Sequence, residues 1–192
     1  MIVLAGGIGS GKSVVARILR LKGFGVFDCD FEARRLMESD PCVKAALLAA
    51  VGSEIYDDSG SLNRKFLASR IFNDPESRRV VNAIVHNAVK DSIRRWILQD
   101  RNNLFVETAI PAQSGIAEMA SQIWIVDASV DSRLARVRLR DDRSVEEILK
   151  IMDAQAREEE AIFSFDNVKT IHNNPADSLL TQIDSLLSCS II

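Results

Sequence analysis

The chain has 192 residues, the size of one domain, and 47% of them are hydrophobic and 27% charged, which is typical of a globular protein with a real core. The net charge of −3 shows no basic surplus, which argues against a nucleic-acid-binding protein. No apolar run reaches the roughly 18 residues of a membrane span, and three widely spaced cysteines without a CxxC indicate reduced thiols in a cytoplasm rather than disulfides or a zinc site.

Five short segments predict strands, because they are apolar, partly β-branched and mostly end on a polar residue. They are Met1–Ala5, Gly25–Asp28, Leu104–Glu107, Ile123–Asp127 and Val168–His172. Segments with helical spacing lie between them: Lys12–Lys22, Asp30–Glu38, Pro41–Val51, Asn63–Phe72, Glu76–Asp100, Ser129–Arg140, Ser144–Glu159 and Pro175–Leu187. Continuous apolar strands that alternate with helices predict an α/β fold with a parallel sheet buried on both faces.

The spacing of the predicted strands indicates one domain, 1–192, with two helical excursions. About seventy-five residues separate the second strand from the third, far more than a simple crossover needs. We therefore expect a core of residues 1–37, 101–127 and 161–192, a helical insertion at 38–100, and a shorter, arginine-rich excursion at 128–160.

The first predicted strand runs directly into a phosphate-binding motif. Gly6–Ser13 matches G-x-x-x-x-G-K-[ST], the P-loop, and an amphipathic helix follows it. Backbone N–H groups that turn inward around a phosphate need unusual dihedral angles and no obstructing side chains, and the following helix adds its positive N-terminal end. The motif predicts that ATP is bound by Gly7, Ile8, Gly9, Ser10, Gly11, Lys12, Ser13 and Val14. Lys12 would reach the β- and γ-phosphates, and the Ser13 hydroxyl would bind Mg²⁺.

Other signatures separate the classes of P-loop protein. A GTPase needs N-K-x-D, which is absent, and Asp57–Gly60 fits D-x-x-G only in a polar turn with no strand before it. The L-S-G-G-Q signature of transport ATPases is also absent. A short chain with helical flaps and an arginine-rich lid is typical of small-molecule kinases, which the sequence therefore favours.

Two carboxylates follow the second predicted strand. In a parallel sheet this strand end shares an edge with the P-loop, and Asp28 and Asp30, two apart in an extended chain, are expected on the same side. One could accept the proton of an acceptor hydroxyl while the other orders Mg²⁺ or its waters. The alternative is that Asp30 caps the next helix.

The second excursion carries the candidate lid arginines Arg133, Arg136, Arg140 and Arg143. Spacings of three and four place them along one helix face, where they could stabilise a phosphoryl group in transfer. The alternative is a solvated face whose counter-charges are Asp131, Asp141, Asp142 and Glu146. Glu158–Glu160 are expected to face solvent.

Three blocks together resemble the dephospho-CoA kinase family: the P-loop, Asp28-x-Asp30, and Gly60–His86 (GSLNRKFLASRIFNDPESRRVVNAIVH). Arg140-Asp141-Asp142 with the later Ala154-Gln155 is similar to the family's lid pattern, and Asn173-Asn174 to its adenine loop. The resemblance spans essentially the whole chain.

The resemblance implies a nucleoside-monophosphate-kinase-like three-layer sandwich with a five-stranded parallel sheet, in which 38–100 binds CoA and 128–160 is the lid. It implies a cytoplasmic transferase that moves the ATP γ-phosphate to the 3′-hydroxyl of dephospho-CoA, the final step of coenzyme A biosynthesis. The expected partner is this small substrate, not nucleic acid or a membrane, and the protein is expected to be a monomer or a weak homo-oligomer.

The resemblance also assigns residues. Asp30 would be the base, while Lys12, Arg136 and Arg140 would stabilise the phosphoryl group and Asn173 would contact the nucleotide. Acceptor-binding residues would be Asp28, Asp30, Arg64, His86, Glu107 and Gln113. For His86, packing within the helical insertion is the alternative. The chain departs from the family pattern at Ala5, Asn87, Gln113 and Pro175, and Glu107 is the candidate replacement for a carboxylate at 113.

Two other functions stay open at this point. One is a different small-molecule P-loop kinase that acts on a nucleoside or a similar alcohol. The other is a non-catalytic nucleotide-binding regulator, which only the departures at Ala5 and Gln113 favour.

Overall fold

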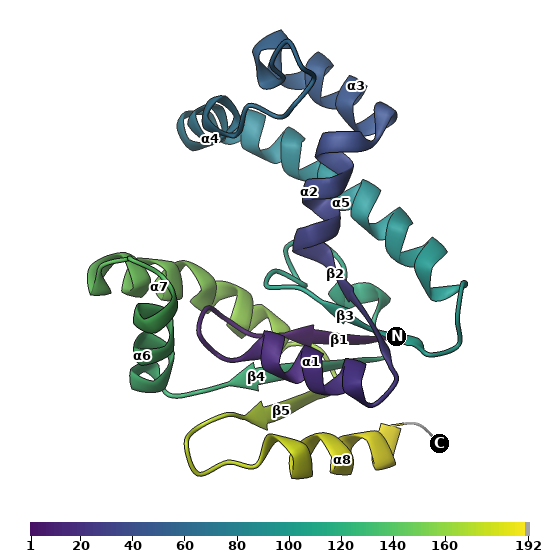
Figure 1. Cartoon of the computed structure of the whole chain (residues 1–192), viewed down its shortest axis with the longest axis vertical. Helices are drawn as coiled ribbons and strands as arrows, with labels where there is room; N and C mark the ends of the chain where they lie inside the picture. The colour runs from purple at the N-terminus through teal and green to yellow at the C-terminus, as the bar shows by residue number, and fades with distance from the viewer. Residues whose placement is uncertain (191–192) are drawn as a thin grey trace. The chain divides into compact units, whose positions relative to one another are not determined.

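The structure is a computed structural model and describes residues 1–190. The chain divides into two compact units (Figure 1). The first consists of Met1–Phe27 together with the chain from Gln99 onward, and the second is Asp28–Leu98. Within residues 1–190, no helix is both long and apolar enough to cross a membrane.

An all-parallel sheet forms the centre of the first unit. Its strands are β1 (Ile2–Ala5), β2 (Gly25–Asp28), β3 (Asn103–Glu107), β4 (Gln122–Asp127) and β5 (Val168–His172). Each predicted strand is confirmed to within about one residue at either end. The strand order is β2-β3-β1-β4-β5, so β1 is central and pairs with β3 on one side and β4 on the other. In such sheets ligands bind beyond the carboxyl ends of the strands, where the strand order reverses.

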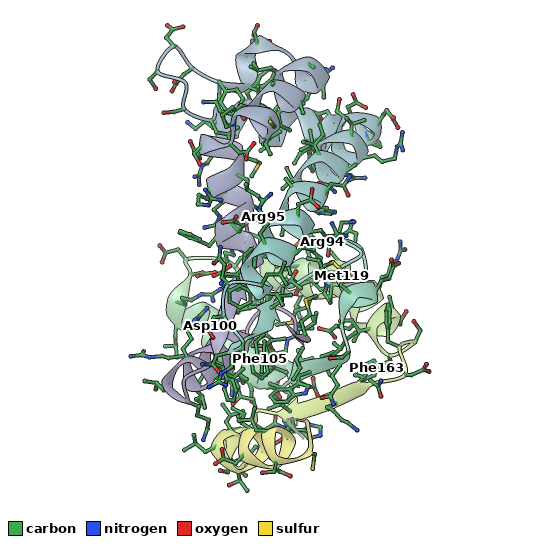
Figure 2. The ribbon with its side chains drawn as sticks, turned by 90° about the vertical axis from the view of Figure 1, so that its right-hand side faces the viewer. Arg94, Arg95, Asp100, Phe105, Met119 and Phe163 are labelled. Carbon is green, nitrogen blue, oxygen red and sulfur yellow. The ribbon has the colours of Figure 1, made fainter. Side chains whose placement is uncertain are left out.

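Apolar side chains cover both faces of the sheet, as the predicted parallel sheet requires. Helices α1 (Lys12–Leu21) and α8 (Leu179–Ser190) pack against each other and against the cluster that contains Leu4, Phe105 and Trp124. The rings of Phe105 and Trp124 lie 5.1 Å apart, and Figure 2 marks Phe105 in this dense region. Alternate positions such as Val3 and Val106 face the other way and are also fully buried.

Helices α6 (Val130–Arg140) and α7 (Val145–Ile162) form a hairpin with a small core of their own. Val137, Ile148 and Met152 are buried together, and Ile8 of the P-loop packs against them. A capping box between Ser144 and Glu147 starts α7. The hairpin is therefore anchored to the loop through an apolar contact.

The beginning of α8 differs from the prediction. The expected helix starts at Pro175, but α8 starts at Leu179 because Asn174–Asp177 forms a turn in which the Asp177 carboxylate accepts the Asn174 N–H. Between β3 and β4, a short 3-10 helix, Ala117–Met119, was not predicted.

The second unit is mainly helical. It contains α2 (Cys29–Ser39), α3 (Pro41–Val51), a 3-10 helix (Ser53–Ile55), α4 (Arg64–Asn73) and α5 (Pro75–Ile97). The long α5 packs against α2, α3 and α4 and is the centre of the unit. The D-x-x-G string is a polar turn, in which the Asp57 carboxylate accepts the N–H groups of Ser59 and Ser61.

Candidate functional site

The P-loop joins the central strand β1 to α1 at the carboxyl edge of the sheet. Three of its glycines, Gly6, Gly9 and Gly11, have φ values of +148°, +76° and +99°. A β-carbon on Gly6 would lie 2.6 Å from the carbonyl oxygen of Val126. Glycine is therefore required here both by the backbone conformation and by the close approach of β4.

Polar groups line the loop and the first turn of α1. The Lys12 ammonium lies 3.5 Å from the Gly6 carbonyl oxygen, so the lysine side chain folds back over the start of the loop. Ser13 and Val14 are exposed in the first turn of α1. The Ser10 hydroxyl is buried and has no hydrogen-bond partner within the part of the chain that the structure describes.

The four lid arginines divide into two pairs. Arg136 donates through Nη1 to the carbonyl oxygens of Gly9 and Ser10, each at 3.2 Å, and the neighbouring Arg133 donates to that of Ile8 at 2.9 Å. Arg140 and Arg143 are instead exposed and pair with Asp141 at 2.9 and 3.8 Å. The hydrogen bond from Arg140 holds the pKa of the Asp141 carboxyl below its usual range. Arg133 and Arg136 thus contact the loop. Arg140 and Arg143 instead match the alternative, a solvated helix face with acidic counter-charges.

The prediction that Glu158–Glu160 face solvent is wrong for two of the three residues. Glu159 pairs with Arg133 at 3.3 Å beside the P-loop. Glu158 accepts the backbone N–H groups of Ala112 and Gln113 at 2.5 and 3.1 Å. Only Glu160 is exposed as expected. Consecutive helical residues point about 100° apart, so one run of glutamates cannot face in a single direction.

Gln155 is a loop contact that sequence reasoning treated only as part of a lid pattern. Its side-chain oxygen accepts the Ile8 N–H at 2.8 Å. Spacing could not have revealed this contact, because Glu159, which shares a helix face with Gln155 four residues earlier, was itself expected to face solvent.

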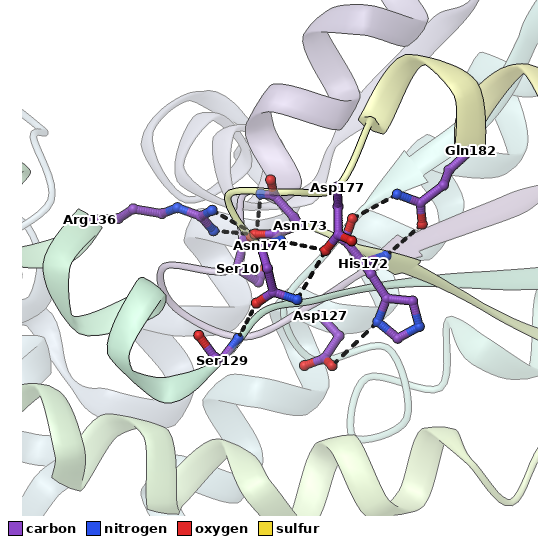
Figure 3. Close-up of polar contacts among 9 residues, drawn as sticks. All are labelled: Ser10, Asp127, Ser129, Arg136, His172, Asn173, Asn174, Asp177 and Gln182. Atoms are coloured by element: carbon purple, nitrogen blue, oxygen red, sulfur yellow. Dashed lines mark hydrogen bonds and ion pairs between the residues drawn. The ribbon is translucent and has the colours of Figure 1, made fainter.

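The turn after β5 also braces the P-loop (Figure 3). The Asn173 side-chain amide donates to the Ser10 carbonyl oxygen at 2.7 Å, and the Asn173 carbonyl accepts from Arg136 Nη2 at 2.6 Å. Asn174 in turn accepts the Ser129 N–H at 2.9 Å. Figure 3 shows that these bonds join the P-loop, the start of the α6–α7 hairpin and the β5 turn into one polar network.

Asp28 and Asp30 take different positions from those expected. Helix α2 begins at Cys29, so the two residues are not both in extended chain, and the expectation that they point to one side is wrong. The Asp28 carboxylate accepts the Phe31 N–H at 2.9 Å, which makes Asp28, not Asp30, the helix cap. Asp30 is exposed in the first turn, and its carboxylate accepts no hydrogen bond from the described residues.

The predicted acceptor residues lie in both units. In the second unit, Arg64 is exposed and pairs with Glu38 at 3.2 Å. His86 is half-buried in α5, and burial, followed by the nearby Lys90 charge, lowers its pKa. In the first unit, Glu107 ends β3 and lies 4.0 Å from Arg20, and the Gln113 side chain is exposed in the following loop.

The site fits a magnesium ion that is held mainly by phosphates. Among residues 1–190, no group of three or more His, Cys, Asp or Glu side chains could hold a metal ion. Mg²⁺ usually keeps several waters and takes one or two protein oxygens together with substrate phosphates. The exposed Ser13 hydroxyl is a suitable single ligand.

The family model and the curated relatives agree on one family. Residues 1–176 match the family model described as dephospho-CoA kinase. The dephospho-CoA kinase of Porphyromonas gingivalis is 36% identical over 94% of this chain and 89% of its own length. That of Escherichia coli K12 is 31% identical over 97% and 90%. A crystal structure from Thermus thermophilus superposes with a TM-score of 0.79 at 29% identity and covers 99% of this chain and 95% of its own.

Proposed function

The chain belongs to the dephospho-CoA kinase family, and from this premise we propose how its residues carry out the reaction. The protein is a transferase that passes the γ-phosphate of ATP to the 3′-hydroxyl of dephospho-CoA, the final step of coenzyme A biosynthesis. The observation that carries the proposal is the loop Gly6–Ser13, in which three of the four glycines have positive φ values and onto which Lys12, Arg133 and Arg136 converge.

The triphosphate binds at the loop. Inward-facing N–H groups and the N-terminal end of α1 hold the phosphates, and Lys12 neutralises the β- and γ-phosphates. The Ser13 hydroxyl would hold Mg²⁺ beside the phosphates, and the ion would supply positive charge against the negative charge that develops during transfer. Arg136 and Asn173 hold the loop in its conformation, because both side chains donate hydrogen bonds to its carbonyl oxygens.

Asp30 acts as the base on the acceptor. The 3′-oxygen of dephospho-CoA attacks the γ-phosphorus in line, its proton passes to the Asp30 carboxylate, and the bond to the β,γ-bridging oxygen breaks to release ADP. The free, exposed carboxylate of Asp30 supports this role, since Asp28 is already used as a helix cap. A general base of this kind usually accelerates the reaction by a factor of about 10²–10⁴.

The acceptor is held by the helical unit Asp28–Leu98, which we equate with the CoA-binding insertion. Arg64 and His86 contribute there. In the first unit, Glu107 at the end of β3 and Gln113 in the following loop are the further acceptor-binding candidates. Arg64 supplies a positive charge for an anionic acceptor, and its pairing with Glu38 is exposed and therefore easily exchanged.

Acceptor-dependent ADP release tests this function. Purified protein with Mg-ATP should release ADP when dephospho-CoA is present and little without it, while Lys12→Ala should release almost none. Shikimate and adenosine serve as competing acceptors. Release that dephospho-CoA does not stimulate, or that another acceptor stimulates more strongly, would contradict the proposed substrate.

A further inference from the structure

Arg133, near the start of α6, is a buried arginine beside the P-loop, with only 7% of its surface exposed. A guanidinium that is removed from water is stable only where partners replace the lost hydration. Its Nε donates to the Ile8 carbonyl oxygen at 2.9 Å, and Nη1 lies 3.3 Å from Glu159 Oε1. Nη2 is buried and has no hydrogen-bond partner within residues 1–190. One charged donor at the loop is therefore left over.

The unpartnered Nη2 lies against Gly7. A β-carbon on Gly7 would collide with it and would lie 2.5 Å from the Glu159 carboxylate. The Lys12 ammonium lies 3.5 Å from the carbonyl oxygen of the preceding residue, Gly6. The Lys12 ammonium and the Arg133 guanidinium thus lie near adjacent residues, Gly6 and Gly7, at the start of the loop. Because the P-loop lysine reaches the β- and γ-phosphates, this end of the loop is where the terminal phosphates belong.

The other lid arginines are already committed. Arg136 donates through Nη1 to two loop carbonyl oxygens and through Nη2 to the Asn173 carbonyl oxygen. Arg140 is exposed, and its guanidinium is paired with Asp141. Arg133 can consequently gain a partner through Nη2 and still keep its hydrogen bond to the Ile8 carbonyl oxygen.

We propose that Arg133 binds the γ-phosphate and that Glu159 is the internal anion which the γ-phosphate replaces. This inference rests on the proposed function, because it assumes that the loop binds ATP. The γ-phosphate supplies oxygens to Nη2 and repels the Glu159 carboxylate, since both anions would share one guanidinium. The Glu159 side chain is 30% exposed and can turn into water. ADP lacks the γ-phosphate and leaves the pair intact, so Arg133 distinguishes ATP from ADP.

Equilibrium binding of ATP and ADP, without dephospho-CoA, tests the role of Arg133. Arg133→Gln should weaken ATP binding on the order of 10- to 100-fold, because it removes a charged hydrogen bond, while ADP binding should change less than about threefold. Arg138→Gln is the matched control, an exposed arginine of the same helix, and should bind both nucleotides as the wild type does. An equal loss for ATP and ADP, or an unchanged affinity for ATP, would overturn the proposal.

Glu159→Gln provides a second test that keeps Arg133 and does not depend on the folding of the first variant. Without the competing carboxylate, ATP should bind several-fold more tightly and ADP should bind as before. Unchanged or weaker ATP binding would overturn the exchange. A wild-type protein that binds neither nucleotide would instead contradict the proposed function, so the two failures can be told apart.

Discussion

Asp28 and Asp30 lie two residues apart at the start of α2 but differ in what their carboxylates do. Asp28 accepts the Phe31 N–H and caps the helix, whereas Asp30 is exposed and accepts no hydrogen bond from the described residues. A carboxylate that stabilises nothing in the fold can be replaced without loss of structure. Its role should therefore be visible in the chemistry alone.

Asp30→Asn should lower kcat by about 10²–10⁴, since the amide cannot take the hydroxyl proton. ATP affinity should stay within about twofold of wild type, because no nucleotide contact is assigned to this carboxylate. Steady-state kinetics and direct nucleotide binding measure the two quantities. Asp58→Asn, an exposed carboxylate in a turn of the same unit, is the control. Equal losses of turnover and of ATP affinity would refute the base assignment.

Glu32 is a buried carboxylate in the second unit with a structural role. It accepts two hydrogen bonds from Arg35, at 2.7 and 2.8 Å, and one from the Ser92 hydroxyl at 2.5 Å. The Arg35 hydrogen bond lowers the pKa of the Glu32 carboxyl below 4.5, and burial opposes this only in part. A carboxyl with a lowered folded-state pKa stabilises the fold above its unfolded pKa and loses that contribution as the pH falls.

Glu32→Gln should therefore lower the free energy of unfolding at neutral pH by about 1–3 kcal/mol. The difference from wild type should shrink as the pH falls below the ordinary pKa of 4.5. Urea denaturation at a series of pH values measures it, with the exposed Glu54→Gln as control. A difference that stayed constant into acid would show that the charge of Glu32 does not stabilise the fold.

At the scale of elements, α7 joins the α6–α7 hairpin to the core at two points and pairs with α6 at a third. Gln155 holds the P-loop at Ile8, Glu158 holds the loop after β3, and Glu159 holds Arg133. The helix was predicted from its helical spacing, and it is present. What the sequence could not show was which polar residues turn inward, because that depends on where the helix packs.

Glu158 and Glu160 form a natural pair for testing this attachment, since they have the same side chain on the same helix. Glu158→Gln should lower the free energy of unfolding by about 1–3 kcal/mol, because a charged acceptor for two backbone N–H groups becomes neutral. Glu160→Gln, at an exposed position, should change it by less than about 0.5 kcal/mol. Thermal denaturation compares the two variants, and equal effects would mean that the Glu158 contact is not stabilising.

At the scale of the whole molecule, the fold was largely predictable from local patterns. Buried strands such as Ile123–Asp127 are short and apolar, and Gly6–Ser13 constrains both the strand before it and the helix after it, so the α/β class followed. Strand order was not predicted, because pairing of β1 with β3 and β4 depends on contacts between distant segments. The prediction that Asp28 and Asp30 point to one side was wrong for a local reason, since α2 starts one residue earlier than expected.

The candidate site was predictable where a motif fixes the backbone and less so where side chains meet. Three of the four P-loop glycines have the positive φ values that favour glycine. The lid arginines were predicted as one face, but Arg140 pairs with a neighbouring carboxylate in solvent while Arg133 is buried. Charge spacing alone could not separate these two environments, because burial is set by the packing of α6 against the loop.

The most direct test of the account is the identity of the product. After incubation of the purified protein with Mg-ATP and dephospho-CoA, phosphorus NMR and mass spectrometry would identify what has been phosphorylated and at which position. The account predicts CoA with a new 3′-phosphate monoester, formed in a one-to-one ratio with ADP and absent with Lys12→Ala. ADP without phosphorylated acceptor, or a phosphate on another hydroxyl, would contradict it.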